Sequence, residues 1–264
     1  MADILEEIVA YKRNEVEKFR SELSQVFLEG RSEIVLRSKK VTEPMSKALR
    51  NAKGGIIAEF KRKSPSKGWI NRTASPDIIP LSYQANGAAA LSILTDTKYF
   101  GGSNQHILAA VNHGVKLPVL YKNFIISEYQ IYQACLSRAS AVLLIAACLT
   151  RQECASFISK AHSLGMEVLL ELHSDQDLDY VDLGADMYGI NNRNLGTFTV
   201  DVENSFRLVG SLPPDSVKVS ESGISDPSVA KDLISAGFDG LLIGESFMRE
   251  EDPGLALNQF ISAL

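Results

Sequence analysis

Residues 56–61 read Ile-Ile-Ala-Glu-Phe-Lys, a run of apolar side chains that ends in a carboxylate and an ammonium. In a β-strand alternate side chains point to the same side, so Ile57, Glu59 and Lys61 share one face. Strands that are buried on both faces show apolar runs instead of strict alternation, which is typical of parallel sheets covered by helices. The segment therefore predicts a buried parallel strand with two charged groups at its carboxyl end.

Seven further apolar runs follow at intervals of about 20 to 35 residues, the length of one strand–helix unit. Together with the first, they span residues 56–60, 88–95, 118–122, 141–147, 167–172, 187–191, 217–220 and 240–244. Amphipathic segments such as 153–164 and 227–236 lie between them, and Gly165, Gly184 and Gly237 suit helix C-caps. Eight such units predict an α/β fold, a closed (β/α)₈ TIM barrel. An open doubly wound sheet is the alternative, but it would have about five to seven strands, and the dinucleotide-binding GxGxxG is absent after the first run.

The first fifty or so residues are highly charged and contain no convincing strand. Their apolar positions recur at helical spacings, at Ile4, Ile8, Phe19, Leu23 and Phe27. We expect an N-terminal helical extension, residues 1–50, that covers the barrel as a lid or from below. No linker or low-complexity stretch separates it from residues 54–264, so we expect a single TIM-barrel domain over 1–264. The chain ends soon after the eighth expected helix, which predicts a protein with one function.

Composition argues against several classes of partner. The net charge is −5 and the basic residues are dispersed, whereas a nucleic-acid-binding protein needs a basic patch or stripe. The longest apolar runs, such as 141–149, are too short to cross a bilayer, and the acidic N-terminus is unlike a signal peptide. Three cysteines without a CxxC pair are typical of a reducing compartment. We expect a cytoplasmic monomer that binds neither nucleic acid nor membrane.

Four more of the apolar runs end in polar side chains that face the same inward side as Glu59 and Lys61. They are Lys122, Glu171, Asn191 with Arg193, and Glu221. The carboxyl ends of TIM-barrel strands meet at one mouth, where active sites form. These groups therefore predict a polar pocket at the mouth, although a network of salt bridges on the barrel rim is an alternative.

Small residues follow the last two runs, as Ser222-Gly223-Ile224-Ser225 and Gly244-Glu245-Ser246. Loops at these positions of a TIM barrel often hold phosphate through backbone N–H groups, and glycine lets the backbone approach the phosphate closely. Ser225 and Ser246 could equally be helix N-caps. The two loops predict a phosphorylated small molecule as the ligand.

Seven segments, in order, resemble the signatures of the indole-3-glycerol phosphate synthase family over essentially the whole chain. The most specific is Ile57-Ala-Glu-Phe-Lys-Arg-Lys-Ser-Pro-Ser-Lys-Gly68. The others are Leu91-Ser-Ile-Leu-Thr-Asp96 with Tyr99-Phe-Gly-Gly-Ser103, Pro118-Val-Leu-Tyr-Lys-Asn-Phe-Ile125, Val168-Leu-Leu-Glu-Leu-His173, Gly189-Ile-Asn-Asn-Arg-Asn-Leu195, Ser220-Glu-Ser-Gly-Ile224 and Leu242-Ile-Gly-Glu-Ser246. The resemblance implies a carboxy-lyase of tryptophan biosynthesis that uses no metal or organic cofactor. Its sugar-phosphate substrate would be 1-(2-carboxyphenylamino)-1-deoxyribulose 5-phosphate, converted into indole-3-glycerol phosphate, carbon dioxide and water.

The resemblance also implies catalytic roles. Lys122 is the candidate general acid at the ribulose carbonyl. Lys61 would bind the substrate and could protonate the departing hydroxyl, and which lysine acts in which step stays open. Glu171 is the candidate base for the dehydration, with Glu59 and Glu221 holding the lysines and the substrate hydroxyls.

Other residues would bind the ends of the substrate. Asn191 would orient a carboxylate or hydroxyl, and Arg193 could pair with the substrate carboxylate. Phe124 and Leu195 would flank the aromatic ring, although each is more often plain core at such a position. The phosphate would be held by Ser66, Ser222, Gly223, Gly244 and the backbone of Glu245.

Two positions depart from the family pattern. Tyr121 stands where an arginine is common, and Asn123 stands where an aspartate usually follows the lysine. Both flank Lys122 on the opposite parity, so neither should point directly at the substrate. The four histidines lack metal-binding spacings, and His173, two residues after Glu171, could either contact the site or lie at the surface.

Two other functions stay open on the sequence alone. A phosphoribosylanthranilate isomerase would rely on a cysteine–aspartate pair at strand ends, but Cys148 follows the fourth run and not the first. Isomerisation also leaves the two strand-end lysines unexplained. A sugar-phosphate binder without catalytic activity should have lost Lys61, Lys122 or Glu171, and all three are present.

Overall fold

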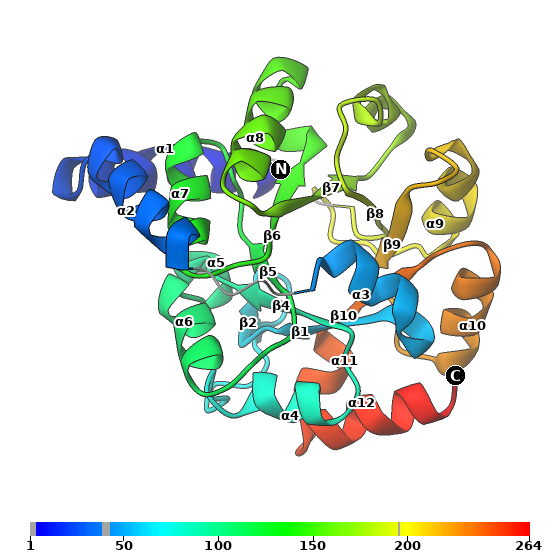
Figure 1. The fold of residues 1–264 in the computed structure, drawn as a ribbon. Helices are drawn as coiled ribbons and strands as arrows, with labels where there is room; N and C mark the ends of the chain where they lie inside the picture. Colours follow the sequence, from blue (N-terminus) through cyan, green and yellow to red (C-terminus); the bar gives the residue numbers. More distant parts are fainter. Residues whose placement is uncertain (1–3, 39–42, 195) are drawn as a thin grey trace.

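A computed structural model describes residues 4–38, 43–194 and 196–264 (Figure 1). Eight parallel strands close into a barrel in the order β1–β10–β9–β8–β7–β6–β5–β4. They are β1 Ile56–Phe60, β4 Ala90–Leu94, β5 Val119–Lys122, β6 Ala141–Ile145, β7 Glu167–Leu172, β8 Met187–Asn191, β9 Val217–Glu221 and β10 Gly240–Ile243. Each predicted run coincides with one of these strands to within two residues at either end, so the TIM-barrel prediction is confirmed. Two short strands after β1, β2 Lys63–Ser64 and β3 Gly68–Trp69, pair as an antiparallel hairpin.

Helices cover the outside of the barrel (Figure 1). They are α4 Ile79–Ala85, α6 Asn104–Asn112, α7 Glu128–Leu136, α8 Arg151–Ser163, α9 Glu203–Leu208, α10 Pro227–Ser235 and α12 Pro253–Ser262, with the short helices α5 Thr97–Phe100 and α11 Glu245–Met248. Gly165 and Gly237 follow α8 and α10 with φ of 63° and 104°, as expected for C-cap glycines. Gly184 does not, because the connection from β7 to β8 holds only the 3₁₀-helix η3 Asp175–Tyr180 and no α-helix. Across the described part of the chain, no helix has the length and apolar character needed to cross a membrane.

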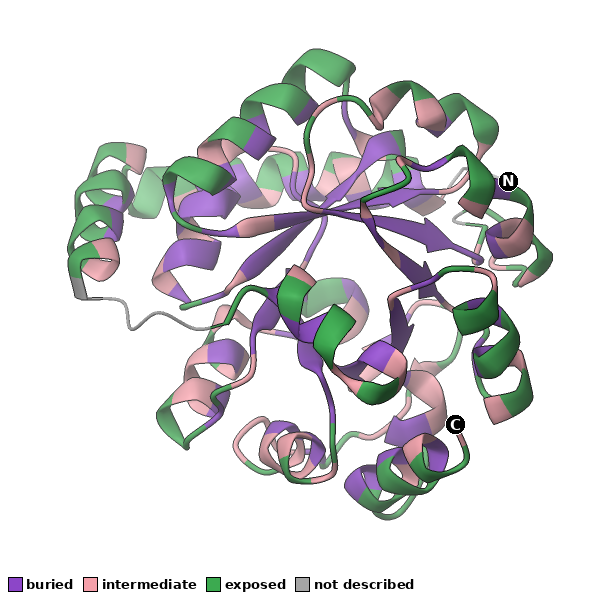
Figure 2. Cartoon of the chain, turned by 45° about the vertical axis from the view of Figure 1, so that its right-hand side comes forward, coloured by how far each residue is buried: buried purple, intermediate pink, exposed green. Residues whose placement is uncertain are grey.

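Alternate strand positions pack into two separate hydrophobic clusters. One cluster fills the inside of the barrel and includes Ile57, Leu120, Leu143, Leu169 and Val219. The other lies between the strands and the surrounding helices and includes Ile56, Phe60, Ile93, Tyr121 and Leu170. Figure 2 shows the strands buried and the outer faces of the helices exposed. Glu59, Lys122 and Glu171 each follow a residue of the inner cluster by two positions. They therefore face the inside of the barrel, as predicted.

The N-terminal extension reaches both ends of the barrel. Helix α3 Met45–Asn51 lies at the amino ends of the strands, where Met45 and Leu49 join the inner cluster and Leu49 packs against Gly240, the first residue of β10. Helix α1 Ile4–Glu22 reaches the other end, where Leu5 and Ile8 join the same cluster. The extension is thus both a bottom cap and part of the upper wall.

A buried ion pair ties α1 to the carboxyl end of β4. Lys12 Nζ lies 2.6 Å from Oδ2 of Asp96, and the two side chains are 1% and 0% exposed. Burial lowers the pKa of Lys12, but the charges of Asp96 and Glu15 outweigh it and raise that pKa above its usual value. Lys12 therefore stays charged at neutral pH, and its ion pair with Asp96 anchors the extension.

Helix α2 Gln25–Ser38 packs beside α7 (Figure 1). Of the apolar positions at helical spacing, Leu23 lies between α1 and α2 and is 39% exposed, and Phe27 on α2 is 52% exposed, whereas Leu28 is buried. The charged, loosely periodic sequence of this region did not determine which side of the helix meets the barrel.

Candidate active site

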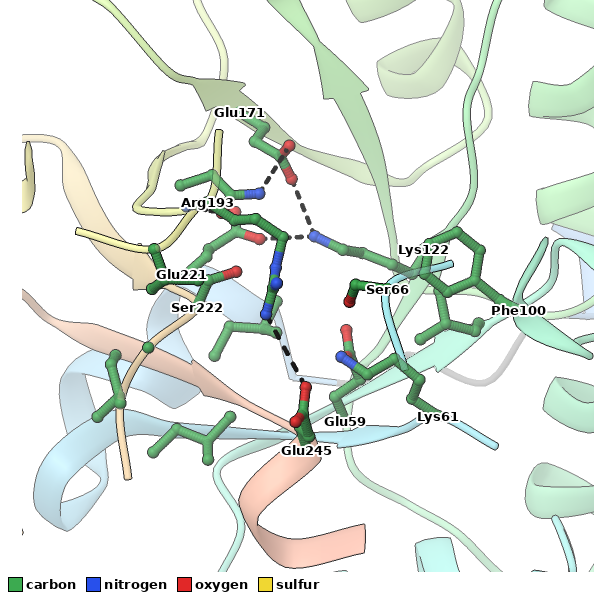
Figure 3. Close-up of a pocket in the computed structure, with 18 of the residues that line it drawn as sticks. Glu59, Lys61, Ser66, Phe100, Lys122, Glu171, Arg193, Glu221, Ser222 and Glu245 are labelled. Atoms are coloured by element: carbon green, nitrogen blue, oxygen red, sulfur yellow. Dashed lines mark hydrogen bonds and ion pairs between the residues drawn. The ribbon is translucent and has the colours of Figure 1, made fainter. Parts of the chain in front are cut away.

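A cavity of about 610 Å³ opens at the carboxyl ends of the strands (Figure 3). It is lined by all seven charged or amide residues predicted there, namely Glu59, Lys61, Lys122, Glu171, Asn191, Arg193 and Glu221. They come together because inward-facing side chains at parallel strand ends converge on the barrel axis. Several of them form ion pairs with one another, but they do so inside a cavity and not along an outer rim.

Lys122 ends β5, and its ammonium lies between carboxylates from two other strands (Figure 3). Its Nζ is 3.0 Å from Oε2 of Glu171 on β7 and 2.6 Å from Oε2 of Glu221 on β9. Burial lowers the pKa of Lys122, but the charges of Glu171, Glu221 and Glu59 outweigh it and raise that pKa well above its usual value. The lysine is therefore an ammonium ion at neutral pH.

The two carboxyl groups that share Lys122 differ in their other partners. Glu171 accepts a hydrogen bond from Nδ2 of Asn191 at 3.1 Å, and its Oε1 lies 3.2 Å from Nε2 of His173. Burial raises the pKa of Glu171, but Lys122 and His173 outweigh it and lower that pKa. Oε1 of Glu221 has no hydrogen-bond partner in the described residues.

Burial, reinforced by the charge of Glu171 and opposed by Lys122, raises the pKa of Glu221 to about 7. Because the two carboxyl groups interact strongly, their protons leave in steps that belong to the pair. One step lies near neutral pH, so the pair can both accept and release a proton in that range.

Two glycines leave room for the carboxylates in the cavity wall. A Cβ on Gly189 of β8 would lie 2.3 Å from Oε1 of Glu221, and a Cβ on Gly244 would lie 2.6 Å from Oε1 of Glu59. Any larger residue would displace these side chains, so glycine determines where both carboxylates lie.

A second lysine–carboxylate pair stands on β1 and the residue after it. Lys61 Nζ lies 2.7 Å from Oε1 of Glu59, with exposed fractions of 15% and 4%. The other oxygen of Glu59 accepts a long hydrogen bond, 3.4 Å, from Oγ of Ser92 on β4. The cavity thus contains two ammonium groups, each held by carboxylate.

The five residues predicted to bind phosphate also line the cavity, namely Ser66, Ser222, Gly223, Gly244 and Glu245. Ser222 and Gly223 adopt left-handed backbone conformations with φ of 69° and 78°. The Glu245 side chain forms an ion pair with Arg249 and lies 3.9 Å from Nη2 of Arg193. A substrate carboxylate would therefore have to compete with Glu245 for Arg193.

The alternative role of Ser225 and Ser246 as N-caps is wrong. Helix α10 is capped by Asp226, whose side chain accepts from the N–H of Ser228, and Gly244 precedes α11. Ser246 instead lines the cavity, and its Oγ has no hydrogen-bond partner in the described residues. Ser246 is therefore a further candidate for contact with the phosphate, which its place in the Gly244-Glu245-Ser246 loop could have suggested.

One predicted neighbour of the aromatic ring, Phe124, lies in the cavity wall, and its ring centroid is 6.1 Å from that of Phe100. Phe100 also lines the cavity but was not predicted, although it falls within the quoted segment 99–103. The other predicted neighbour, Leu195, lies outside the described residues.

The two departures from the family pattern lie in different places. Tyr121 belongs to the outer cluster, as expected from its parity, and its hydroxyl donates to Oδ1 of Asn104 at 2.8 Å. Asn123, however, lines the cavity. Its Nδ2 nevertheless donates to Oγ1 of Thr95 at 2.8 Å and to the hydroxyl oxygen of Tyr121 at 3.4 Å, so its side-chain amide is directed towards Tyr121, on the side expected from its parity.

Among the residues described, no group of three or more histidine, cysteine or acidic side chains could hold a metal ion. His173 contacts Glu171 of the site, so the first of its two predicted positions, contact with the site and not a place at the surface, is the one observed.

Comparison with known proteins gives a consistent result. The model of a family described as indole-3-glycerol phosphate synthase matches residues 5–260. A protein of that name from Bacteroides thetaiotaomicron is 54% identical to this chain over the full length of both. Another from Polaromonas sp. is 40% identical and covers 98% of each chain.

Solved structures with a similar fold are far more distant in sequence. The 3-hexulose-6-phosphate synthase from Salmonella typhimurium has a TM-score of 0.63 at 13% identity, covering 79% of this chain and 97% of that one. The tryptophan synthase alpha subunit from Legionella pneumophila has a TM-score of 0.60 at 12% identity, covering 85% and 97%. At these identities the similarity supports the barrel fold alone.

Proposed function

The chain belongs to the indole-3-glycerol phosphate synthase family, which makes it a carboxy-lyase of tryptophan biosynthesis, and we propose that the cavity at the mouth of its barrel is the active site. The observation that carries the proposal is the ammonium of Lys122, bound by Glu171 and Glu221 in the same cavity as the loops after β9 and β10. An acid, a base and a place for phosphate therefore lie within reach of one small substrate.

The substrate, 1-(2-carboxyphenylamino)-1-deoxyribulose 5-phosphate, must undergo three changes. The ring carbon that bears the carboxylate bonds to the ribulose carbonyl carbon, whose oxygen takes up a proton. Carbon dioxide then leaves, which restores the aromatic ring. Finally the new hydroxyl departs as water while a neighbouring carbon loses a proton. The first change needs a proton donor, and the last needs both an acid and a base.

Lys122 donates the proton to the carbonyl oxygen. Its neighbouring carboxylates keep it charged, so it can stabilise negative charge that develops on that oxygen. The same carboxylates make it a weak acid in the empty cavity. A substrate oxygen that takes the place of Glu221 beside Nζ removes part of that stabilisation, so the pKa of Lys122 falls when substrate binds.

Glu171 takes up the proton released in the dehydration. Its lowered pKa keeps it ionised, and the hydrogen bond from Asn191 orients it. Glu221 holds Lys122 in the empty cavity and binds substrate hydroxyls once a substrate oxygen has taken its place beside Nζ. Its pKa near neutral pH also allows it to carry a proton between steps.

Lys61 binds the substrate and is a second proton source for the departing hydroxyl, with Glu59 holding its ammonium in place. When substrate binds, Arg193 releases the Glu245 side chain and binds the substrate carboxylate instead. A guanidinium can bind a carboxylate through two parallel hydrogen bonds. Phe124 packs against the aromatic ring. The phosphate binds at Ser66, Ser222, Gly223, Gly244 and the backbone of Glu245.

We also propose that residues 1–264 act as one domain, as a monomer in the cytoplasm. The extension and the barrel share a hydrophobic core, because α1 and α3 contribute side chains to the inner cluster. The cavity has its candidate acid, base and phosphate-binding groups without a second copy of the chain. The three cysteines of the sequence include no CxxC pair, which suits a reducing compartment.

The test follows indole fluorescence after purified protein is mixed with the substrate. We expect turnover by the wild type and a loss of about a hundredfold or more in Lys122→Ala. Lys18→Ala, on the exposed surface of α1, is the matched control and should keep full activity. Full activity in Lys122→Ala with loss in Lys61→Ala would move the acid to Lys61. Absence of turnover by folded wild-type protein would contradict the proposal as a whole.

A further inference from the structure

Asn192 connects three segments of the cavity wall without lining the cavity itself. It follows β8 directly and is only 3% exposed. Its neighbour Asn191 contacts Glu171 in the cavity, so Asn192 points to the opposite side, into the layer between β8, β9 and α9.

Every polar atom of Asn192 has a partner. Its Nδ2 donates to the carbonyl oxygen of Ser222 and to Oγ of Ser220, both at 3.1 Å. Its Oδ1 accepts from the N–H of Ser205 at 3.1 Å and from Oγ of Ser205 at 2.8 Å. Its backbone N–H donates to the carbonyl oxygen of Glu221, and its carbonyl oxygen accepts from the N–H of Asp201, both at 2.9 Å.

A buried polar network in which all members are satisfied is rigid and specifies one arrangement of the groups around it. Ser205 and Ser220 are 0% exposed, and their hydroxyl oxygens lie 2.7 Å apart, so the network closes on itself. Asn192 therefore has a single orientation, with its Nδ2 directed at Ser222.

The residue at the end of this network has an unusual backbone. Ser222 adopts φ of 69°, a left-handed conformation that residues other than glycine rarely adopt and that persists only when the surroundings hold it. The hydrogen bond from Nδ2 of Asn192 holds the carbonyl group of this residue. Gly223 follows with φ of 78°, and both residues line the cavity.

We propose that Asn192 is a positioning residue of the phosphate site. It touches no substrate atom, but it holds Ser222 and Gly223 in the backbone conformation that binds the phosphate. The inference rests on the proposed function, which puts the phosphate at these residues.

The test compares two substitutions of Asn192 with a matched control. Asn192→Asp keeps the shape of the side chain but replaces the Nδ2 donors with an oxygen that repels the Ser222 carbonyl. Asn192→Ala removes the side-chain contacts altogether. Ser205→Ala removes a hydrogen bond from the far side of the same network and leaves the contact between Asn192 and Ser222 intact.

For each variant, we would measure KM, kcat, melting temperature and the inhibition constant of inorganic phosphate as a competitor of the substrate. Both Asn192 variants should raise KM and the phosphate inhibition constant by about tenfold, the size of one lost hydrogen bond to a charged group. The kcat should stay within about threefold, because the backbone N–H of residue 192 still donates to Glu221 in every variant. Ser205→Ala should melt at a lower temperature while keeping KM and the phosphate inhibition constant near those of the wild type.

Gly223→Ala separates failure of this inference from failure of the phosphate assignment. At φ of 78° an added Cβ would lie 2.5 Å from Cγ1 of Val200, so the substitution must distort the loop. If it weakens phosphate inhibition while the Asn192 variants do not, the phosphate site stands and the role of Asn192 is refuted. If none of the three variants changes phosphate inhibition, the phosphate is not bound at this loop.

A fall in kcat at unchanged KM in the Asn192 variants would overturn the inference as well, because Asn192 would then act on the catalytic carboxylates. If Asn192→Ala does not fold, Asn192→Ser replaces it in the same measurements, because a serine side chain at this position is too short to reach Ser222.

Discussion

Gly189→Ala should reduce activity by displacing Glu221. The new Cβ would lie 2.3 Å from Oε1 of Glu221 and 3.3 Å from Cδ1 of Leu169, whereas ordinary contact begins near 3.4 Å. The leucine can adjust by a small movement, but the carboxylate must move by about 1 Å. Its other oxygen accepts a hydrogen bond of 2.6 Å from Lys122, so this movement disturbs the candidate acid.

The size of the effect follows from that displacement. A misplacement of about 1 Å in an active site can reduce the rate about a hundredfold. Overpacking of a closely packed interior costs about 1–3 kcal/mol of unfolding free energy. We therefore expect Gly189→Ala to lose most of its kcat while it still folds.

The control is the same substitution at the other end of the barrel. A Cβ on Gly240 would lie 3.0 Å from Cδ1 of Leu49 and 3.2 Å from Cγ2 of Val219, both apolar and far from the charged groups. Gly240→Ala should therefore lose stability, measured by urea unfolding, but keep its kcat in the fluorescence assay. If the two substitutions acted only through stability, kcat would change in the same way in Gly189→Ala and Gly240→Ala.

A double-mutant cycle makes the prediction refutable. In the Glu221→Ala background there is no carboxylate for the new Cβ to displace, so Gly189→Ala should have little further effect on kcat. Wild-type kcat in Gly189→Ala, or equal losses of kcat with and without Glu221, would refute the geometry on which the prediction depends.

Three further predictions concern buried charges. The raised pKa of Glu221, about 7 in the folded protein against 4.5 in the unfolded chain, contributes stability that is complete below about pH 4.5 and is lost as the pH rises towards 7. Glu221→Gln should therefore make the unfolding free energy less dependent on pH between 5 and 7, and an unchanged slope in urea titrations would contradict this. Lys12→Met leaves the buried carboxylate of Asp96 unpaired and should lower the unfolding free energy by about 3–5 kcal/mol, whereas a loss similar to that of an exposed lysine would show that the pair is unimportant. His173→Gln removes a charged partner of Glu171 and should reduce kcat by about tenfold while shifting the acidic limb of the pH–rate profile upwards, and an unshifted profile would exclude an electrostatic role.

The barrel and much of its mouth could be predicted because they depend on local rules. Apolar runs about one strand–helix unit apart identify the strands, and the period of two along each strand identifies which side chains face inward. This period places Glu59, Lys122 and Glu171 on the inner side of the barrel without reference to any contact between strands. The period gives no information outside the strands, so Phe100 on α5, which lines the cavity, could not be found in this way.

Helix capping and crossover structure were less predictable. Ser225 looked like an N-cap, but Asp226, the next residue, makes the capping hydrogen bond. Gly184 looked like a helix C-cap, but the chain from β7 to β8 contains no α-helix. Both errors arise because several neighbouring residues suit the same local role, and packing decides between them.

Sequence alone determined which charged and amide side chains at the strand ends enter the cavity, because strand alternation is a property of the covalent backbone. Only the tertiary structure decided how those residues are paired. Lys122 meets Glu171 and Glu221 because the barrel brings together residues that are 49 and 99 positions apart in the chain, whereas Lys61, directly after β1, meets Glu59 of that same strand. The same closure sets the protonation of the groups, since the pKa of Glu221 depends on its burial and on charges from other strands. Electrostatic energy depends on distance in space, and the sequence specifies that distance only once the chain has folded.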